Sequence, residues 1–163
     1  PEKTRQLLHR AREMGFTLRT TFIVGFPGET DEQFAHLMGF VREIQFDRLG
    51  AFPYSPEEDT PAARMDGQLP EEIKQKRLDE LMTAQQTFSL ERNRLRIGTE
   101  EKVLVETVDG KGHGVGRSAQ EAPDTDGVIK LTGVSEADLG QFVRARITDA
   151  EVYDLRAERI RED

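Results

Sequence analysis

The chain of 163 residues has no cysteine and no tryptophan, and it has only three histidines. Without cysteine it cannot form a disulfide, present a thiolate nucleophile, or bind an iron–sulfur cluster or a zinc ion through sulfur. The histidines, His9, His36 and His113, do not follow the spacing of a metal site, and exposed or half-buried side chains are the simpler interpretation. The sequence therefore predicts no metal site within this chain.

Long apolar runs are also missing. No segment approaches the roughly 18 consecutive apolar residues that cross a bilayer, and the N-terminus lacks the basic and apolar blocks of a signal peptide. The composition, 36% hydrophobic and 33% charged with nine phenylalanines, is typical of a globular protein with modest cores. We expect a cytoplasmic protein that does not contact membranes, while a mature secreted domain would share these features.

Positive charge is scarce in the last part of the chain. Residues 97–163 contain 9 Lys and Arg against 15 Asp and Glu, a net charge of −6, whereas the first 96 residues contribute only −2 to the total of −8. Contacts to phosphate supply most of the sequence-independent affinity for nucleic acid, and they require cations. This acidic segment is therefore poorly suited to bare RNA and well suited to a basic protein.

The first 68 residues alternate between helical and strand patterns. Pro1 can occupy the first turn of a helix, which Gly15 ends. The apolar residues at helical spacing in this helix are Leu7, Leu8, Ala11 and Met14. Residues 18–24 are rich in β-branched and aromatic side chains, which predicts a strand buried on both faces. The sequence GFPG at residues 25–28 ends that strand.

A second helix begins at Thr30, which forms a capping box with Gln33. Its predicted apolar stripe consists of Phe34, Leu37, Met38, Val41 and Ile44. Residues 48–54 predict a second strand, and the order helix, strand, helix, strand with short links indicates a parallel sheet. Because two parallel strands leave edges and faces open, we expect residues 1–68 to be part of a larger α/β barrel or to need a partner.

The rest of the chain divides into one long helix and an all-β region. Residues 69–96 predict a connector helix, which Gly98 ends. The apolar side of this helix is marked by Ile73, Leu78, Leu81, Met82, Phe88 and Leu95. In residues 97–163 the pattern switches to a period of two, and the strand candidates are 103–107, 115–119, 127–131, 141–150 and 153–160. Five short strands with glycine turns indicate a small closed antiparallel, OB-like barrel.

Segments at both ends of the chain resemble one enzyme family. Residues 21–30 (TFIVGFPGET) and 54–63 (YSPEEDTPAA) are similar to the late strands of the radical-SAM methylthiotransferases. The acidic barrel resembles the TRAM domain that closes those enzymes. Residues 116–127, which end in APDTDG, and residues 140–155 are similar specifically to the RimO branch, which methylthiolates an aspartate of a small-subunit ribosomal protein. The resemblance covers essentially all of the chain.

This resemblance implies part of an enzyme. The family uses S-adenosylmethionine and two 4Fe–4S clusters, yet none of the cluster cysteines is in this chain. The chain would then be the C-terminal part: the last βα units of an open TIM-like barrel, the connector helix and the TRAM domain, with the N-terminal remainder as a partner. No catalytic residue is expected in it, and it should be inactive by itself. In the parent, a deoxyadenosyl radical would abstract hydrogen from the aspartate β-carbon before sulfur is inserted.

The resemblance also implies a cofactor edge at the ends of the two predicted strands, where α/β folds place ligands. The residues expected to bind S-adenosylmethionine are Gly25, Phe26, Pro27, Gly28, Phe52 and Tyr54. Gly25 and Gly28 would let the backbone approach the ligand, and Phe52 and Tyr54 could flank the adenine. The alternatives are a tight turn at the two glycines, core packing of Phe52, and a loop-shaping role for Tyr54.

In the barrel, the residues expected to dock the substrate are Arg117, Ser118, Glu121, Asp124 and Asp126. Their loop would steer a basic ribosomal protein, with binding that weakens as salt rises. Alternatively, Asp124 and Asp126 cap a turn before Gly127, and Arg117 pairs with one of them. Two other functions stay open: a tRNA adenosine methylthiotransferase, and a non-enzymatic OB-like nucleic-acid or ribosome-binding module. The net charge of −6 argues against direct tRNA binding.

Overall fold

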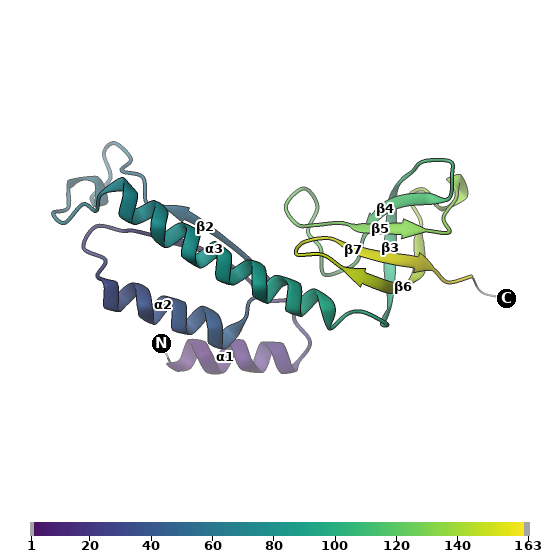
Figure 1. The fold of residues 1–163 in the computed structure, drawn as a ribbon, viewed down its shortest axis with the longest axis horizontal. Helices are drawn as coiled ribbons and strands as arrows, with labels where there is room; N and C mark the ends of the chain where they lie inside the picture. Colours follow the sequence, from purple (N-terminus) through teal and green to yellow (C-terminus); the bar gives the residue numbers. More distant parts are fainter. Residues whose placement is uncertain (1, 162–163) are drawn as a thin grey trace. The chain divides into compact units, whose positions relative to one another are not determined.

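The computed structural model describes residues 2–161, and Pro1, with the helical position predicted for it, lies outside the described residues. The chain forms two compact units, Pro1–Phe88 and Ser89–Asp163. We call them the N-terminal unit and the barrel unit, and Figure 1 shows the order of their helices and strands.

The N-terminal unit alternates helices and strands, as predicted. Its elements are α1 (Glu2–Glu13), β1 (Arg19–Val24), α2 (Asp31–Ile44), β2 (Arg48–Pro53), the short 3₁₀ turn η1 (Ala62–Arg64) and α3 (Glu71–Arg94), which belongs to this unit up to Phe88. β1 and β2 pair in parallel from Arg19 with Arg48 to Val24 with Pro53. The predicted parallel arrangement is therefore confirmed.

The start of α2 shows why this helix begins where it does. The Thr30 hydroxyl accepts a hydrogen bond from the amide of Gln33, and the Gln33 side chain accepts one from the amide of Thr30. Two amides that would otherwise lack a partner are thus satisfied. The predicted stripe of α2 faces the core of the unit: Phe34, Met38, Val41 and Ile44 are buried, and Leu37 is half-buried.

One expectation about burial in this unit is wrong, that of a strand buried on both faces. β1 is buried on one face only, because Phe22 and Val24 pack toward the helices whereas Ile23 points the other way and is 57% exposed. A two-stranded sheet has a second face that these helices do not cover. On α1, Leu8 and Ala11 pack on the core, but Leu7 and Met14 are exposed.

The barrel unit is a closed five-stranded sheet in the order β3-β4-β5-β7-β6. Its strands are β3 (Glu100–Val108), β4 (His113–Arg117), β5 (Ile129–Thr132), β6 (Phe142–Ala150) and β7 (Leu155–Arg159), with the 3₁₀ turn η2 (Glu136–Asp138) between β5 and β6. All five predicted strands are present. The expectation of an entirely antiparallel barrel is wrong, because β5 and β7 pair in parallel.

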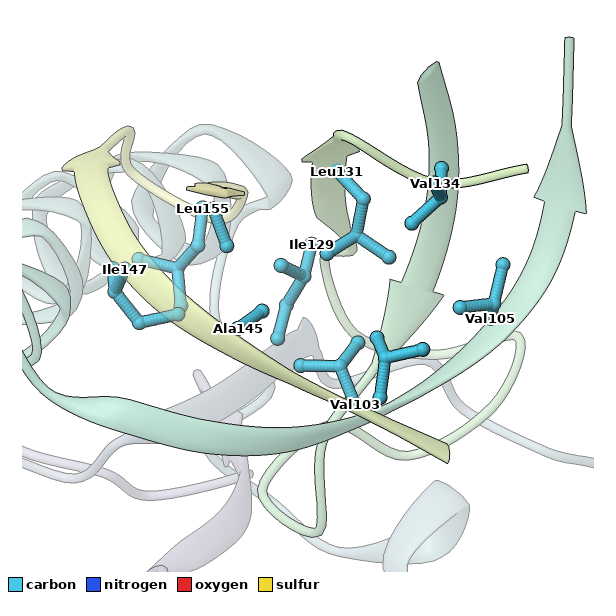
Figure 2. Packing of buried hydrophobic residues seen from close by; sticks show 10 residues of the cluster. Val103, Val105, Ile129, Leu131, Val134, Ala145, Ile147 and Leu155 are labelled. Carbon is cyan, nitrogen blue, oxygen red and sulfur yellow. The ribbon is translucent and has the colours of Figure 1, made fainter. Parts of the chain in front are cut away.

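Small and branched apolar side chains fill the barrel. Figure 2 shows labelled members of this core, which point toward one another: Val103, Val105, Ile129, Leu131, Val134, Ala145, Ile147 and Leu155. They come from β3, β5, β6 and β7 and, for Val134, from the segment after β5. The alternation of buried and exposed residues is clearest in β6, as a period of two requires. At Gly127 the chain passes so close to the loop before β7 that a Cβ would overlap the carbonyl oxygen of Tyr153. Only glycine fits there.

Within the described residues, no helix is both long enough and apolar enough to span a bilayer.

We expect Thr30→Ala to lower the free energy of unfolding of the N-terminal unit by about 1 kcal/mol, because the capping bond is lost. Gly39→Ala, in the same helix at an exposed position with nothing near its Cβ, should raise it by up to about 1 kcal/mol. Urea unfolding followed by circular dichroism measures both. Equal effects of the two substitutions would contradict the capping assignment.

Candidate cofactor edge and docking loop

The carboxyl ends of β1 and β2 carry exposed apolar side chains. Ile23 and Phe52 are register partners on the open face of the sheet, and Phe52 is 62% exposed. Phe26, in the loop after β1, stacks edge to face on Tyr54, with 5.1 Å between ring centroids. An exposed apolar face at the carboxyl edge of parallel strands is the usual place for a ligand in an α/β fold.

Polar contacts with Glu29, Arg77 and Gly67 hold the loop after β1 in place. The Gly25 amide donates to the carboxylate of Glu29 at 3.0 Å, and the same carboxylate binds Arg77 of α3 at 2.6 Å. The Gly28 amide donates to the carbonyl of Gly67 at 2.9 Å. The guanidinium of Arg77 is buried and also reaches Asp31 at 2.7 Å. These bonds fix the loop before any ligand binds.

Gly25 packs against the buried side chain of Lys74. Its φ is +73°, and a Cβ on it would lie 2.5 Å from Cγ of Lys74, so both backbone conformation and space require glycine. The Lys74 ammonium lies 5.6 Å from the centre of the Tyr54 ring. The hydroxyl of Tyr54 is buried and has no hydrogen-bond partner among the described residues. Because buried hydroxyls are normally bonded, this oxygen is a candidate ligand contact.

The structure brings the predicted cofactor residues together at this edge. Gly25, Phe26, Pro27 and Gly28 form the turn after β1, in which the Glu29 amide bonds to the Phe26 carbonyl at 2.9 Å. Phe52 lies next to the last residue of β2 and is exposed, so core packing does not explain it. Tyr54 is buried beside the turn, as a loop-shaping residue would be. Whether these residues bind S-adenosylmethionine stays a prediction.

Sequence reasoning missed the polar side of α3. Beyond the apolar positions, this helix buries Lys74, Arg77, Gln85, Ser89 and Asn93. Four of these five, with the core residue Leu81, follow a strict spacing of four residues from Arg77 to Asn93. That repeat is a helical stripe, and it could have been recognised if polar residues had been allowed in the buried face.

In the barrel unit, Arg96 organises the start of the predicted docking loop. Arg96 is 8% exposed, and its guanidinium binds both oxygens of Glu101, at 2.8 and 2.7 Å. It also binds Glu121 at 2.5 Å and the hydroxyl of Ser118 at 3.1 Å. The second oxygen of Glu121 accepts from the amide and the hydroxyl of Ser118, at 3.0 and 2.8 Å. Every oxygen of the buried Glu121 carboxylate therefore has a partner.

The charges in this cluster stabilise one another. Burial by itself would raise the pKa of Glu121, but the hydrogen bond and the charge of Arg96 outweigh it, and the pKa is lowered. Burial would likewise lower the pKa of Arg96, yet the bonds to Glu101 and Glu121 raise it. Both groups are therefore ionised at neutral pH.

These positions bear on three of the predicted docking residues, whose contact with a substrate stays a prediction. Ser118 and Glu121, at 7% and 5% exposure, face Arg96 and not the solvent, so the carboxylate and the hydroxyl hold the loop from inside. Arg117 pairs at 2.6 Å with Glu106 of the neighbouring strand, not with an aspartate of the loop. The sequence offered no signal for this cluster, because Arg96 follows Arg92 and Arg94 at alternate positions and nothing in the sequence distinguishes it as the partner of Glu121.

Asp124 and Asp126 differ in position. Asp126 is half-buried and accepts a hydrogen bond from the amide of Ala122 at 2.7 Å, which supports the interpretation that it caps a turn. Asp124 is exposed, adopts a left-handed conformation with φ of +60°, and no ion pair is recorded for it among the described residues. Asp124 is therefore the carboxylate best placed to meet a partner.

The opposite charge gathers elsewhere on the barrel. Lys102 of β3 is the register partner of Arg144 of β6, and its ammonium lies 4.6 Å from the centre of the exposed Phe142 ring. Arg144 and Arg146 both bind Glu100, at 2.5 and 2.8 Å. This β3–β6 cation group is thus partly neutralised and does not form an uninterrupted basic strip.

Among residues 2–161, no three His, Asp or Glu side chains are arranged to hold a metal ion. The sequence itself has no cysteine that could ligate a cluster.

Residues 97–160 match the TRAM domain family. The whole chain is similar to proteins named ribosomal protein uS12 methylthiotransferase RimO. That of Syntrophotalea carbinolica is 52% identical over 155 residues, 93% of this chain and 34% of the relative. That of Desulforudis audaxviator is 49% identical over 151 residues, 93% and 33% of the two chains.

The chain is a homologue of the RimO proteins. The RimO of Bordetella pertussis is 45% identical over 161 residues, 98% of this chain and 36% of that protein. The resemblance noted in the GFPGE and APDTDG segments is therefore confirmed, as is the TRAM assignment. The chain spans about a third of the length of these curated relatives.

We expect Glu121→Gln to lower the free energy of unfolding of the barrel unit by about 2 kcal/mol at pH 7, because a hydrogen bond between charged groups is lost. The pKa of Glu121 is lower in the folded state than its ordinary value of 4.5. Its contribution is therefore complete above that value and is lost as the pH falls through the folded pKa.

The difference in the free energy of unfolding between the wild type and Glu121→Gln should accordingly shrink below about pH 4.5. Hydrogen exchange of barrel amides at pH 7 and pH 4 measures it. A difference that is constant over this range would show that the Glu121 charge contributes nothing.

Proposed function

We propose that this chain is the C-terminal part of a radical-SAM enzyme that methylthiolates the β-carbon of an aspartate in the ribosomal protein uS12. The observation that carries the proposal is the identity of 45–52% to RimO proteins over nearly the whole chain. The chain supplies one edge of the S-adenosylmethionine site and a module that docks the substrate protein. A ribosomal substrate places the enzyme in the cytoplasm.

The N-terminal unit fits the cofactor by its shape and its polar groups. Phe52 and Ile23 offer an apolar surface for the adenine, and the exposed Gly28, which has nothing near its Cβ position, leaves room for the ligand to approach the backbone. The buried hydroxyl of Tyr54 has no hydrogen-bond partner among the described residues, and a bound ligand could supply one. When bound, S-adenosylmethionine supplies the radical chemistry of the reaction, together with iron–sulfur clusters held by cysteines outside this chain. The role of these residues is to bind and orient it.

The barrel unit fits a cationic protein by its charge. The net charge of −6 on residues 97–163 of this unit attracts a basic polypeptide over a distance set by the ionic strength. Ion pairs within the barrel cancel much of that charge locally, so the exposed Asp124 is the strongest candidate for direct contact. Opposite charge raises the rate of encounter and orients the partner.

One observation favours a second function. The β3–β6 cation group places Lys102 against the exposed ring of Phe142, with Arg144 and Arg146 farther along the same strand as Phe142. Cations interleaved with an aromatic ring are the features that bind single-stranded nucleic acid. The alternative is therefore an RNA-binding barrel, as in a tRNA-modifying enzyme or a ribosome-binding module.

In the complete enzyme loaded with its clusters, we expect Phe52→Ala to weaken S-adenosylmethionine binding about fivefold, because an aromatic contact of about 1 kcal/mol is lost. Leu7→Ala, which removes an exposed apolar side chain of α1 in the same unit, is the control and should leave the affinity unchanged. Isothermal titration measures both. Identical affinities for the two variants would remove Phe52 from the cofactor site.

The two substrate classes can be separated with this 163-residue chain. We expect it to bind purified uS12 with an affinity that falls as salt rises, and to bind tRNA weakly at every salt concentration. Fluorescence anisotropy with labelled uS12 and with labelled tRNA measures the two affinities. Tight tRNA binding that Lys102→Glu abolishes would instead establish the RNA-binding alternative.

A further inference from the structure

The loop of residues 117–127, which we call the acidic loop, is anchored at two places. Near its start, the buried Glu121 carboxylate binds Arg96 at 2.5 Å and the Ser118 amide at 3.0 Å. At its end, Gly127 packs against the backbone of Tyr153, and the next amide, of Val128, donates to Asp154 at 3.0 Å. The exposed Asp124 lies between the two anchors.

The anchors are chemically different. The second anchor combines the close approach of Gly127 to the backbone of Tyr153 with one hydrogen bond to the Asp154 carboxylate. The first contains a salt bridge, in which the Arg96 guanidinium joins Glu121 to Glu101 of β3. Removal of that guanidinium takes a bonded cation away from the buried Glu121 and the half-buried Glu101, and carboxylates that lose such a bond are driven toward solvent.

From this geometry we infer that Arg96 is a positioning residue for partner recognition: it sets the conformation in which the acidic loop presents Asp124 to a cationic side chain of the docked protein. The inference rests on the proposed function of the barrel unit as a docking module. Arg96 itself does not touch the partner, because its guanidinium is buried among Glu101, Glu121 and Ser118. A preformed loop spares the ordering cost that a flexible loop would meet on binding.

The sign of the charge effect makes this inference testable. Arg96→Gln removes one positive charge from an already acidic barrel, so long-range electrostatics by itself would strengthen binding of a basic protein. If Arg96 positions the acidic loop, the same substitution should instead weaken binding. Arg156→Gln is the matched control, since Arg156 is an exposed arginine of β7 that pairs with Glu151 and Asp149, outside the acidic loop.

The experiment is a double-mutant cycle with the 163-residue chain and labelled uS12, read by fluorescence anisotropy. We expect Asp124→Asn and Arg96→Gln each to weaken binding about two- to fivefold, the range of an exposed ion pair. We expect the double variant to bind no more weakly than either single variant, because a misplaced Asp124 has no contact left to lose. Arg156→Gln should bind as tightly as the wild type or more tightly.

A second measurement separates positioning from loss of the fold. Hydrogen exchange should accelerate in residues 118–126 of Arg96→Gln, while the amides of β3 and β6 stay protected. Arg96→Lys, which keeps the charge but binds fewer oxygens, should recover part of the affinity.

Four outcomes overturn the inference. Additive losses in the cycle, or tighter binding by Arg96→Gln, would show that Arg96 acts through net charge or not at all, and would leave the docking function standing. Unprotected β3 and β6 amides in Arg96→Gln would show that Arg96 only maintains the barrel. No binding of uS12 by the wild-type chain would overturn the inference together with the proposed docking function.

Discussion

The requirement that buried polar groups find partners shapes both units. Along α3 and just after it, Arg77, Gln85, Asn93 and Arg96 are buried, and each side chain reaches a carboxylate or a backbone carbonyl outside the helix. A buried polar group without a hydrogen-bond partner at any of these positions would lower the free energy of unfolding by about 1–3 kcal/mol. A long helix with this many buried polar residues therefore specifies where the neighbouring loops lie, which a purely apolar helix face would not do.

The two candidate surfaces follow from that arrangement. In the N-terminal unit, Arg77 fixes Glu29 and thereby the turn at Gly25, beside which an apolar sheet face stays open. In the barrel unit, Arg96 fixes Glu121 and thereby the acidic loop. Each surface consists of exposed groups on a loop whose underside is held by a buried arginine. Rigid support of an exposed contact group is what precise binding requires.

Much of the architecture could be predicted because it depends on local patterns. The capping box at Thr30, the helical stripe of α2 and the five strands of the barrel are each encoded within a few neighbouring residues. The parallel pairing of β5 with β7 could not be predicted, because β6 lies between them in the chain and no local pattern specifies which strands become neighbours. The open face of β1 was missed for a similar reason: an apolar strand has the same sequence whether its second face is covered or not.

By itself, the sequence determined the alternation of helices and strands, the small barrel, the excess of negative charge and the absence of cysteine ligands, since composition and short-range periodicity carry this information. Only the tertiary structure decided which acidic side chains face the solvent. Glu121 and Asp124 lie three residues apart in one acidic loop, yet one is buried on Arg96 and the other is exposed. The reason is physical: the environment of a charge depends on residues distant in the chain, and only folding brings them within bonding distance.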